Sequence, residues 1–138
     1  MDRGSHLDQR SADTSVWIEF LRHGSGGRAA RLARRLGRGE VVVCGPVVAE
    51  LVAGLKDDQR EPLVAALRAL SWAALDRARW IDVGVIAGAL RRRGTPVPLT
   101  DIEIAVIADR AGAEVWTADA DFDRIVEVLD GLRVRQLD

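Results

Sequence analysis

Five carboxylate side chains stand where a folded chain could gather them into a site. Asp13 precedes the first predicted helix, and Glu50 is the only charged residue in the apolar stretch PVVAELVAGL. Asp101 lies in the first turn of a predicted helix, while Asp119 and Asp121 follow a predicted strand. Crowded carboxylates repel one another unless a cation offsets their charge, and donors that are all oxygen suit Mg²⁺ or Mn²⁺. We therefore expect a site for Mg²⁺, with Mn²⁺ as a substitute.

Each of these carboxylates also has a purely structural interpretation. Asp13 and Asp121 could cap helices, a role worth about 1 kcal/mol. Asp101 could serve the dipole of its helix. Glu50 is surrounded by apolar neighbours on its helix, so we expect it to be buried and to need a partner or a metal. A narrow exposed strip on that helix is the alternative.

The segment Thr100-Asp101-Ile102-Glu103 matches a helix capping box. In such a box the hydroxyl of Thr100 caps the helix and the carboxylate of Glu103 reaches back to the backbone N–H of Thr100. We therefore assign Glu103 to the start of the helix, which leaves Asp101 free for chemistry.

The elements that must position these residues follow from hydrophobic periodicity and from Gly and Pro punctuation. The predicted helices cover 15–22, 28–38, 47–55, 59–71, 77–93, 100–111 and 122–130, and the predicted strands cover 40–44, 114–117 and 132–137. Short apolar strands that alternate with helices indicate an α/β fold with a parallel sheet. In such folds ligands bind beyond the carboxyl ends of the strands. The acidic residues lie at such positions.

Length and composition exclude several classes of protein. The chain has 138 residues, which is enough for one domain, and we see no internal repeat. Its single cysteine, Cys44, excludes an intramolecular disulfide and a Cys-rich zinc site, and packing in a strand explains it. We expect residues 1–12 to be a disordered or vector-derived segment and the domain to cover 13–138.

Other motifs point away from alternative chemistries. His6 and His23 have no partner at metal-binding spacing, so we expect both to be solvated. The segment 24–27 lacks the lysine of a phosphate-binding loop. No apolar run has the roughly 18 residues of a membrane span, and no signal-peptide pattern opens the sequence. We therefore expect a cytoplasmic protein with no membrane partner. We also expect the six aromatic residues in the core: Trp17, Phe20, Trp72, Trp80, Trp116 and Phe122.

The formal net charge of −1 hides a separation of charge along the chain. Residues 22–39 carry six arginines and no acid, whereas residues 101–130 carry nine acids and two arginines. Residues 77–93 carry five arginines and one aspartate. Both basic segments are candidate phosphate-contacting surfaces, and a solvated helix face is the simpler alternative.

Four short motifs in order resemble the PIN-domain ribonucleases of the VapC toxin type. They are DTSVWI from Asp13, AEL around Glu50, PLTD ending at Asp101, and TADADF from Thr117. The resemblance covers the chain from Asp13 to about Leu137. In one respect the chain departs from it: residues 7–12 read LDQRSA, where the family carries a hydrophobic strand.

The resemblance implies an α/β/α sandwich with a short, mostly parallel sheet. It also implies a Mg²⁺-dependent endoribonuclease that acts as a homodimer and is inhibited by a VapB-type antitoxin. Carried over residue by residue, Asp13, Glu50, Asp101 and Asp119 match the family's catalytic and metal-binding acids. Asp121 matches a further aspartate used at the metal or as a cap, and the hydroxyls of Ser15 and Thr117 would support the site. A housekeeping nuclease of RNA processing and a catalytically silent binding module remain the alternatives.

Overall fold

The computed structural model describes residues 9–23 and 26–137. Residues 1–8, 24–25 and 138 lie outside the described residues. The described residues therefore do not include His6, the side chain of His23 or the first half of the glycine-rich segment 24–27. The expectation that residues 1–8 stand outside the domain stays a prediction.

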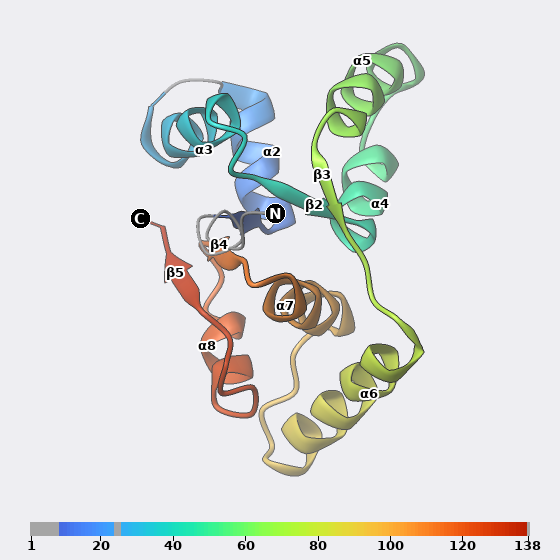
Figure 1. Cartoon of the computed structure of the whole chain (residues 1–138), viewed down its shortest axis with the longest axis vertical. Coiled ribbons are helices and arrows are strands. Elements are labelled where there is room, and N and C mark those ends of the chain that lie inside the picture. The colour runs from blue at the N-terminus through green and yellow to red at the C-terminus, as the bar shows by residue number, and fades with distance from the viewer. Residues whose placement is uncertain (1–8, 24–25, 138) are drawn as a thin grey trace, which may run out of the picture.

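The centre of the molecule is a set of short parallel strands (Figure 1). They are β1 Arg10–Ala12, β2 Val42–Cys44, β3 Ser71–Ala73, β4 Glu114–Thr117 and β5 Val134–Gln136. One sheet has the strand order β1-β4-β5 and the other contains β2 and β3, and every pair is parallel. A parallel bridge between Arg10 and Val41 joins the two. The predicted parallel sheet is confirmed.

Helices cover both sides of these strands, as Figure 1 shows. They are α2 Thr14–His23, α3 Gly27–Gly37, α4 Gly45–Ala53, α5 Asp57–Arg68, α6 Arg77–Arg92, α7 Leu99–Ala111 and α8 Asp121–Val126. One layer contains α2 and α3, and the opposite layer contains α7 with α6 and α8. The helices α4 and α5 flank β2 and β3. The expected α/β/α sandwich is confirmed.

The helix α7 forms the middle of the core. Six of its residues are buried: Ile102, Ile104, Ala105, Val106, Ile107 and Ala108. It packs against β1, β3 and β4 on one side and against α4, α6 and α8 on the others. A helix that is apolar on most of its surface is stable only when other elements surround it. Its first turn, which carries Asp101, is thereby held close to the strands.

Two of the five strands differ from the sequence prediction. Strand β1 lies within residues 1–12, so the expectation that this whole segment stands outside the domain is wrong for residues 10–12. Its side chains show no apolar alternation, yet Ser11 and Ala12 are buried because β1 pairs with β4 and the bridge at Arg10 brings β2 to its other side. Strand β3 was not predicted: the helix predicted over 59–71 ends earlier, at Arg68, and residues 71–73 pair with β2.

The aromatic residues do not all lie in the core. Trp72 is 59% exposed on β3 and Trp80 is 47% exposed on α6, so the expectation is wrong for these two. Both belong to elements at the edge of the fold, where no other described element covers them. Within residues 9–23 and 26–137, no helix combines the length and the hydrophobicity that crossing a bilayer requires.

Candidate active site

An open cleft of about 530 Å³ lies at the carboxyl ends of β1 and β4. Its lining residues are Asp13, Thr14, Ser15, Ile18, Glu50, Asp101, Ala118, Asp119 and Ala120. Four acids separated along the sequence thus meet in one cleft. The strands are parallel, so their carboxyl ends share one edge of the sheet, and side chains that follow them converge there.

The carboxylate of Asp13 is buried and is held by three donors. It is 4% exposed, directly after β1. One oxygen accepts hydrogen bonds from Ser15 Oγ at 2.7 Å and from the backbone N of Val16 at 3.1 Å. The other accepts from Thr117 Oγ1 at 2.5 Å. The bond from Val16 makes Asp13 the cap of α2, so its capping interpretation is confirmed while the same residue also lines the cleft.

Thr117 connects two of the acids. This fully buried residue ends β4, and its hydroxyl donates to Asp13 and accepts from the backbone N of Asp119 at 2.9 Å. Asp119 in turn accepts from the backbone N of Asp121 through its carboxylate, also at 2.9 Å. This chain of hydrogen bonds fixes the turn that presents Asp119 to the cleft.

Asp121 does not cap a helix. The helix α8 already includes Asp121 as its first residue, and Ala120 occupies the cap position without a side-chain hydrogen bond. Its capping interpretation is therefore wrong. The carboxylate of Asp119 accepts the hydrogen bond from the backbone N–H of Asp121. The carboxylate of Asp121 caps no backbone group of α8 and can contact other groups. One of its oxygens lies 3.1 Å from Arg124.

Three of the carboxylates lie close enough to share one cation. Oxygen atoms of Asp101, Asp119 and Asp121 lie within 4.8 Å of one another. Burial, with the negative charges of the other cleft acids, raises the pKa of Asp101 to about 7. Such a shift indicates uncompensated negative charge, which a bound cation would offset. The all-oxygen donor set fits a hard divalent cation.

Glu50 faces the cleft from an exposed position. It lies on the exposed side of α4 beside Ala49 and Ala53, while Val47 and Leu51 are buried. The expected burial of Glu50 is therefore wrong, and the narrow exposed strip is the observed arrangement.

Glu50 is nonetheless anchored. Its carboxylate accepts a hydrogen bond from Thr14 Oγ1 at 2.6 Å, which ties α4 to α2 across the cleft. Thr14 is a residue that sequence reasoning overlooked, although it directly follows Asp13. Its hydroxyl next to a cleft acid was the available signal.

The capping box predicted at Thr100 and Glu103 is not present. The helix α7 begins at Leu99, and the carbonyl of Pro98 accepts from the backbone N of Asp101 and of Ile102. Because the helix starts one residue before Thr100, this residue is no longer at the cap, and no side chain caps α7. The assignment of Glu103 to the helix start is wrong.

Glu103 instead adds negative charge near Glu50. It is partly buried on α7, and burial together with the charge of Glu50 raises the pKa of Glu103. The same two carboxylates act on Cys44. Burial, opposed by a backbone hydrogen bond from Val47 and reinforced by Glu103 and Glu50, raises the pKa of the Cys44 thiol to about 11. Cys44 is therefore a protonated packing residue, as expected.

Comparison with known proteins places this fold and cleft in a class. The family model described as "PIN domain" matches residues 12–128. The chain belongs to the PIN domain family.

Within that family the similarity is to VapC ribonucleases. The chain is 38% identical over 127 residues to Ribonuclease VapC11 of Mycobacterium tuberculosis, across 84% of this chain and 90% of that protein. The same values hold for VapC ribonuclease Mb1587 of Mycobacterium bovis.

Solved structures agree with this assignment at the level of the fold. DNA-bound VapBC from Salmonella typhimurium aligns with a TM-score of 0.75 and 24% identity, covering 93% of this chain and 97% of that one. VapBC2 from Rickettsia felis, bound to a DNA fragment from its promoter, aligns with a TM-score of 0.73 and 19% identity. That alignment covers 94% of this chain and 98% of the other.

Proposed function

We propose that this protein is a Mg²⁺-dependent endoribonuclease toxin of the VapC type. The observation that carries the proposal is the cluster of Asp101, Asp119 and Asp121 beside the open cleft of a PIN domain, which the first two of these residues line. The relatives named as VapC ribonucleases, at 38% identity, support RNA as the substrate. We expect the protein to act in the cytoplasm and to leave 5′-phosphate and 3′-hydroxyl ends.

The acidic residues of the site have two proposed roles, catalysis and metal binding. Asp13, Glu50, Asp101 and Asp119 are the proposed catalytic carboxylates, and together with Asp121 they would hold the cation. When bound, Mg²⁺ or Mn²⁺ supplies a water of lowered pKa and offsets the charge that develops on the phosphodiester.

Two hydroxyls position these acids. The hydroxyls of Ser15 and Thr117 keep the carboxylate of Asp13 in one orientation. Thr117 also orients the turn at Asp119. Fixed ligands of this kind reduce the reorganisation that the reaction would otherwise require.

A cleavage assay tests the proposal. The protein is incubated with tRNA, rRNA and mRNA in Mg²⁺, in Mn²⁺ and in EDTA, and Asp101→Asn is compared with the control Asp130→Asn. Asp130 is exposed and lies outside the cleft. We expect cleavage in both metals, none in EDTA, and loss of activity only for Asp101→Asn. Cleavage that persists in EDTA, or that Asp101→Asn leaves intact, contradicts the metal-carboxylate site. An inactive wild-type protein supports the silent binding module instead.

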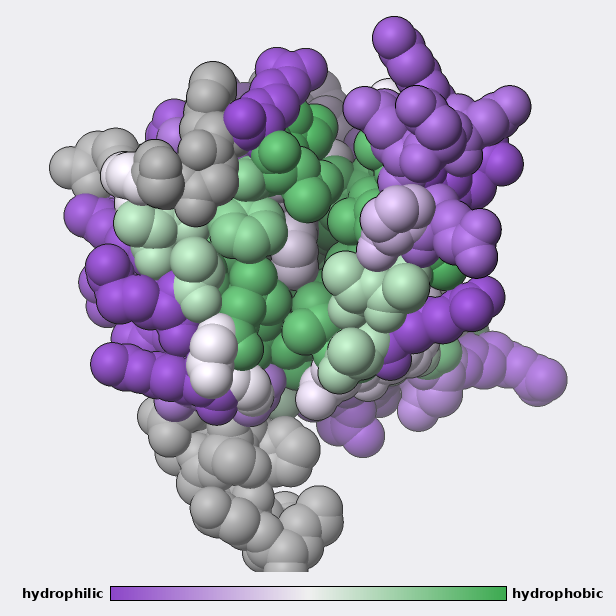
Figure 2. Space-filling model, turned by 90° about the horizontal axis from the view of Figure 1, so that it is seen from above, coloured by the Kyte–Doolittle hydropathy of each residue, from purple (hydrophilic) through white to green (hydrophobic). Residues whose placement is uncertain are grey.

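We propose a VapB-type antitoxin as the partner that controls this site. Figure 2 shows a band of apolar residues between hydrophilic margins on the face seen from above α2, α3 and α5. On α2, Ile18 is 37% exposed and Leu21 is 44% exposed. Ile18 also lines the acidic cleft, so a partner that covers α2 would reach the cleft as well.

The antitoxin and the proposed homodimer use different surfaces. The helix α6 exposes Ile81 by 63% and Val85 by 61%, which is unusual for a helix without a partner. We expect Ile81→Asp to turn the dimer into a monomer in light scattering. We expect Leu21→Asp to abolish inhibition by a cognate VapB-type antitoxin, with the dimer retained. The reverse pattern contradicts the assignment of the two surfaces.

A further inference from the structure

A second cavity, outside the acidic cleft, is lined mainly by arginines. It has a volume of about 220 Å³ and lies between α3 and the strands β4 and β5. Its lining residues are Arg31, Arg34, Arg35, Arg38, Trp116 and Arg135. We call these six residues the arginine pocket. The proposed cleavage chemistry gives none of them a role.

Neighbouring groups hold part of the pocket in place. The guanidinium of Arg35 lies 5.7 Å from the centre of the Trp116 ring and 2.9 Å from Glu40. The guanidinium of Arg10 lies at 5.8 Å from the same ring. Arg135 donates to Glu114 at 3.3 Å. These contacts order the walls of the pocket before any ligand arrives, which lowers the entropic cost of binding.

The positive charge around the pocket exceeds the negative charge. Glu40 pairs with Arg35, and Glu114 is shared between Arg10 and Arg135. Burial and the nearby charge of Arg35 lower the pKa of Arg10. Repulsion between Arg10 and Arg35 contributes to this shift after burial.

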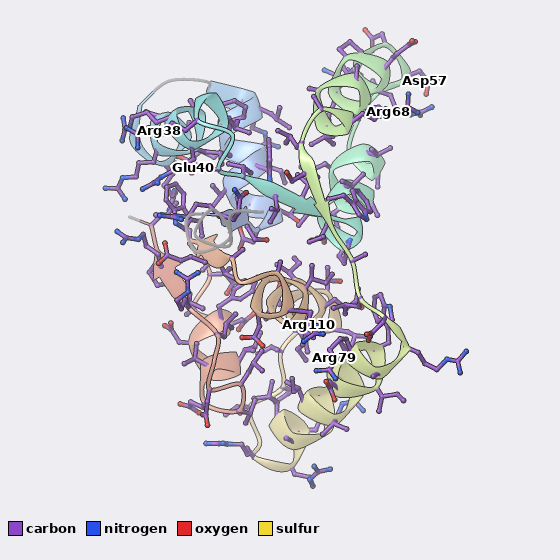
Figure 3. The ribbon with its side chains drawn as sticks, viewed as in Figure 1. Arg38, Glu40, Asp57, Arg68, Arg79 and Arg110 are labelled. Carbon is purple, nitrogen blue, oxygen red and sulfur yellow. The ribbon has the colours of Figure 1, made fainter. Side chains whose placement is uncertain are left out.

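Two arginines of the pocket are exposed and lack an ion-pair partner among the described residues. They are Arg34 and Arg38. Figure 3 shows Arg38 on the same side of the molecule as Glu40, at the end of α3. An anion entering the pocket would therefore meet guanidinium groups that no described carboxylate neutralises.

The edge strand β5 contributes to both the arginine pocket and the acidic cleft. Arg135 lines the pocket, and the next residue, Gln136, donates to the backbone carbonyl of Asp119 at 2.9 Å. Successive residues of a strand point to opposite faces. Because β5 is at the edge of its sheet, a flexible polyanion could pass over it from one site to the other.

We propose that the arginine pocket binds phosphodiester groups of the RNA strand next to the segment that is cut. This inference rests on the proposed ribonuclease function. Guanidinium groups match the geometry of phosphate oxygens with paired hydrogen bonds, and the pocket contains arginine and no lysine. The cavity is small, which suits one or two phosphates better than a folded protein segment.

The test measures RNA binding without cleavage. All variants carry Asp101→Asn, and a short fluorescein-labelled oligouridylate is titrated at several NaCl concentrations. We expect Arg34→Gln/Arg38→Gln to weaken binding several-fold and to lower the salt slope by about 1.4, since each phosphate contact on a single strand contributes about 0.7.

A matched control removes the same charge elsewhere. Arg68 on α5 and Arg110 on α7 are exposed and do not line the arginine pocket. Figure 3 shows both of them away from Arg38. Arg68→Gln/Arg110→Gln should leave both the affinity and the slope near those of the parent. Equal effects of the two double variants, or no effect of either, overturn the proposal.

Two further measurements keep the test decisive. Arg34→Lys/Arg38→Lys retains the charge and should keep the slope but lose affinity, which separates arginine geometry from charge and from misfolding. Oligoglutamate of equal charge should displace the RNA poorly. Equal displacement overturns the proposal in favour of an acidic protein partner.

Failure of this inference is distinguishable from failure of the proposed function. If the protein with Asp101 intact cleaves RNA, and Arg34→Gln/Arg38→Gln in that protein cleaves and binds equally well, only the arginine pocket is disproved. If the intact protein never cleaves but the arginine variant still loses RNA binding selectively, the pocket stands and the ribonuclease function fails.

Discussion

The negative charge of Asp101 lowers the stability of the metal-free protein by a measurable amount. Burial and the surrounding acids raise the pKa of Asp101 from its usual value near 3.8 to about 7. Between these pH values the folded protein keeps a proton that the unfolded chain has released. Stability therefore falls as the pH rises through this window. The shift corresponds to roughly 4 kcal/mol for a fully buried group, and solvent around the half-buried Asp101 reduces this to about 2 kcal/mol.

Replacing Asp101 by asparagine removes this cost while keeping the shape of the side chain. In EDTA at pH 8 we expect Asp101→Asn to be more stable than the wild type by about 2 kcal/mol, or roughly 6–10 °C in Tm. Near pH 4 the advantage should almost disappear, because the wild-type carboxyl is then protonated. Excess Mg²⁺ should narrow or reverse the difference at pH 8, since the ion stabilises only a chain that binds it.

Urea denaturation at the two pH values, with and without Mg²⁺, measures these differences. Asp130→Asn is the matched control, because this exposed acid lies outside the cleft and should show no dependence on pH or metal. An Asp101→Asn protein that is less stable than the wild type in EDTA at pH 8 would refute the electrostatic reasoning. So would an advantage that is equal at both pH values.

Three other tests separate positioning, catalysis and packing. Thr117→Val leaves the buried Asp13 carboxylate without one of its donors, so denaturation should show a loss of about 2 kcal/mol that Thr117→Ser largely restores. Glu50→Gln should slow RNA cleavage roughly 10- to 100-fold, whereas Glu103→Gln, which removes the neighbouring charge, should stay within a few-fold of the wild type in the same assay. Leu32→Ala opens a cavity in the core and should cost about 2–5 kcal/mol of stability, with cleavage unchanged at temperatures well below the Tm.

Local sequence patterns predicted most of the helices and strands. They failed where contacts with residues distant in the sequence determine the secondary structure. The buried helix α7 and strand β4 were predicted because their apolar residues are contiguous. Strand β1 was missed because RSA carries no apolar alternation, and its stability comes from pairing with β4 and the bridge to β2. Strand β3 was also missed: the predicted helix 59–71 overlaps it only at Ser71, and residues 71–73 become a strand by pairing with β2.

In the acidic site, too, some features follow from residues adjacent in the sequence and others from contacts with distant residues. Capping by Asp13 follows from its place before α2 and was foreseen. The absent capping box at Thr100 depends on Pro98, whose carbonyl starts α7 one residue earlier. The exposure of Glu50 depends on which side of α4 packs inward. That side is chosen by the neighbouring helices rather than by the composition of α4.

The sequence by itself determined the chemistry available to this protein: carboxylates at the ends of strands and the starts of helices, without histidine or cysteine ligands. Those features are local, so residue type and spacing reveal them. Only the tertiary structure decided that Asp101, Asp119 and Asp121 form the tight group and that Thr117 joins Asp13 to Asp119. It also decided that arginines of α3 and β5 enclose a second cavity. These arrangements depend on distances between residues far apart in the chain, and such distances are fixed by how the strands pair and the helices pack.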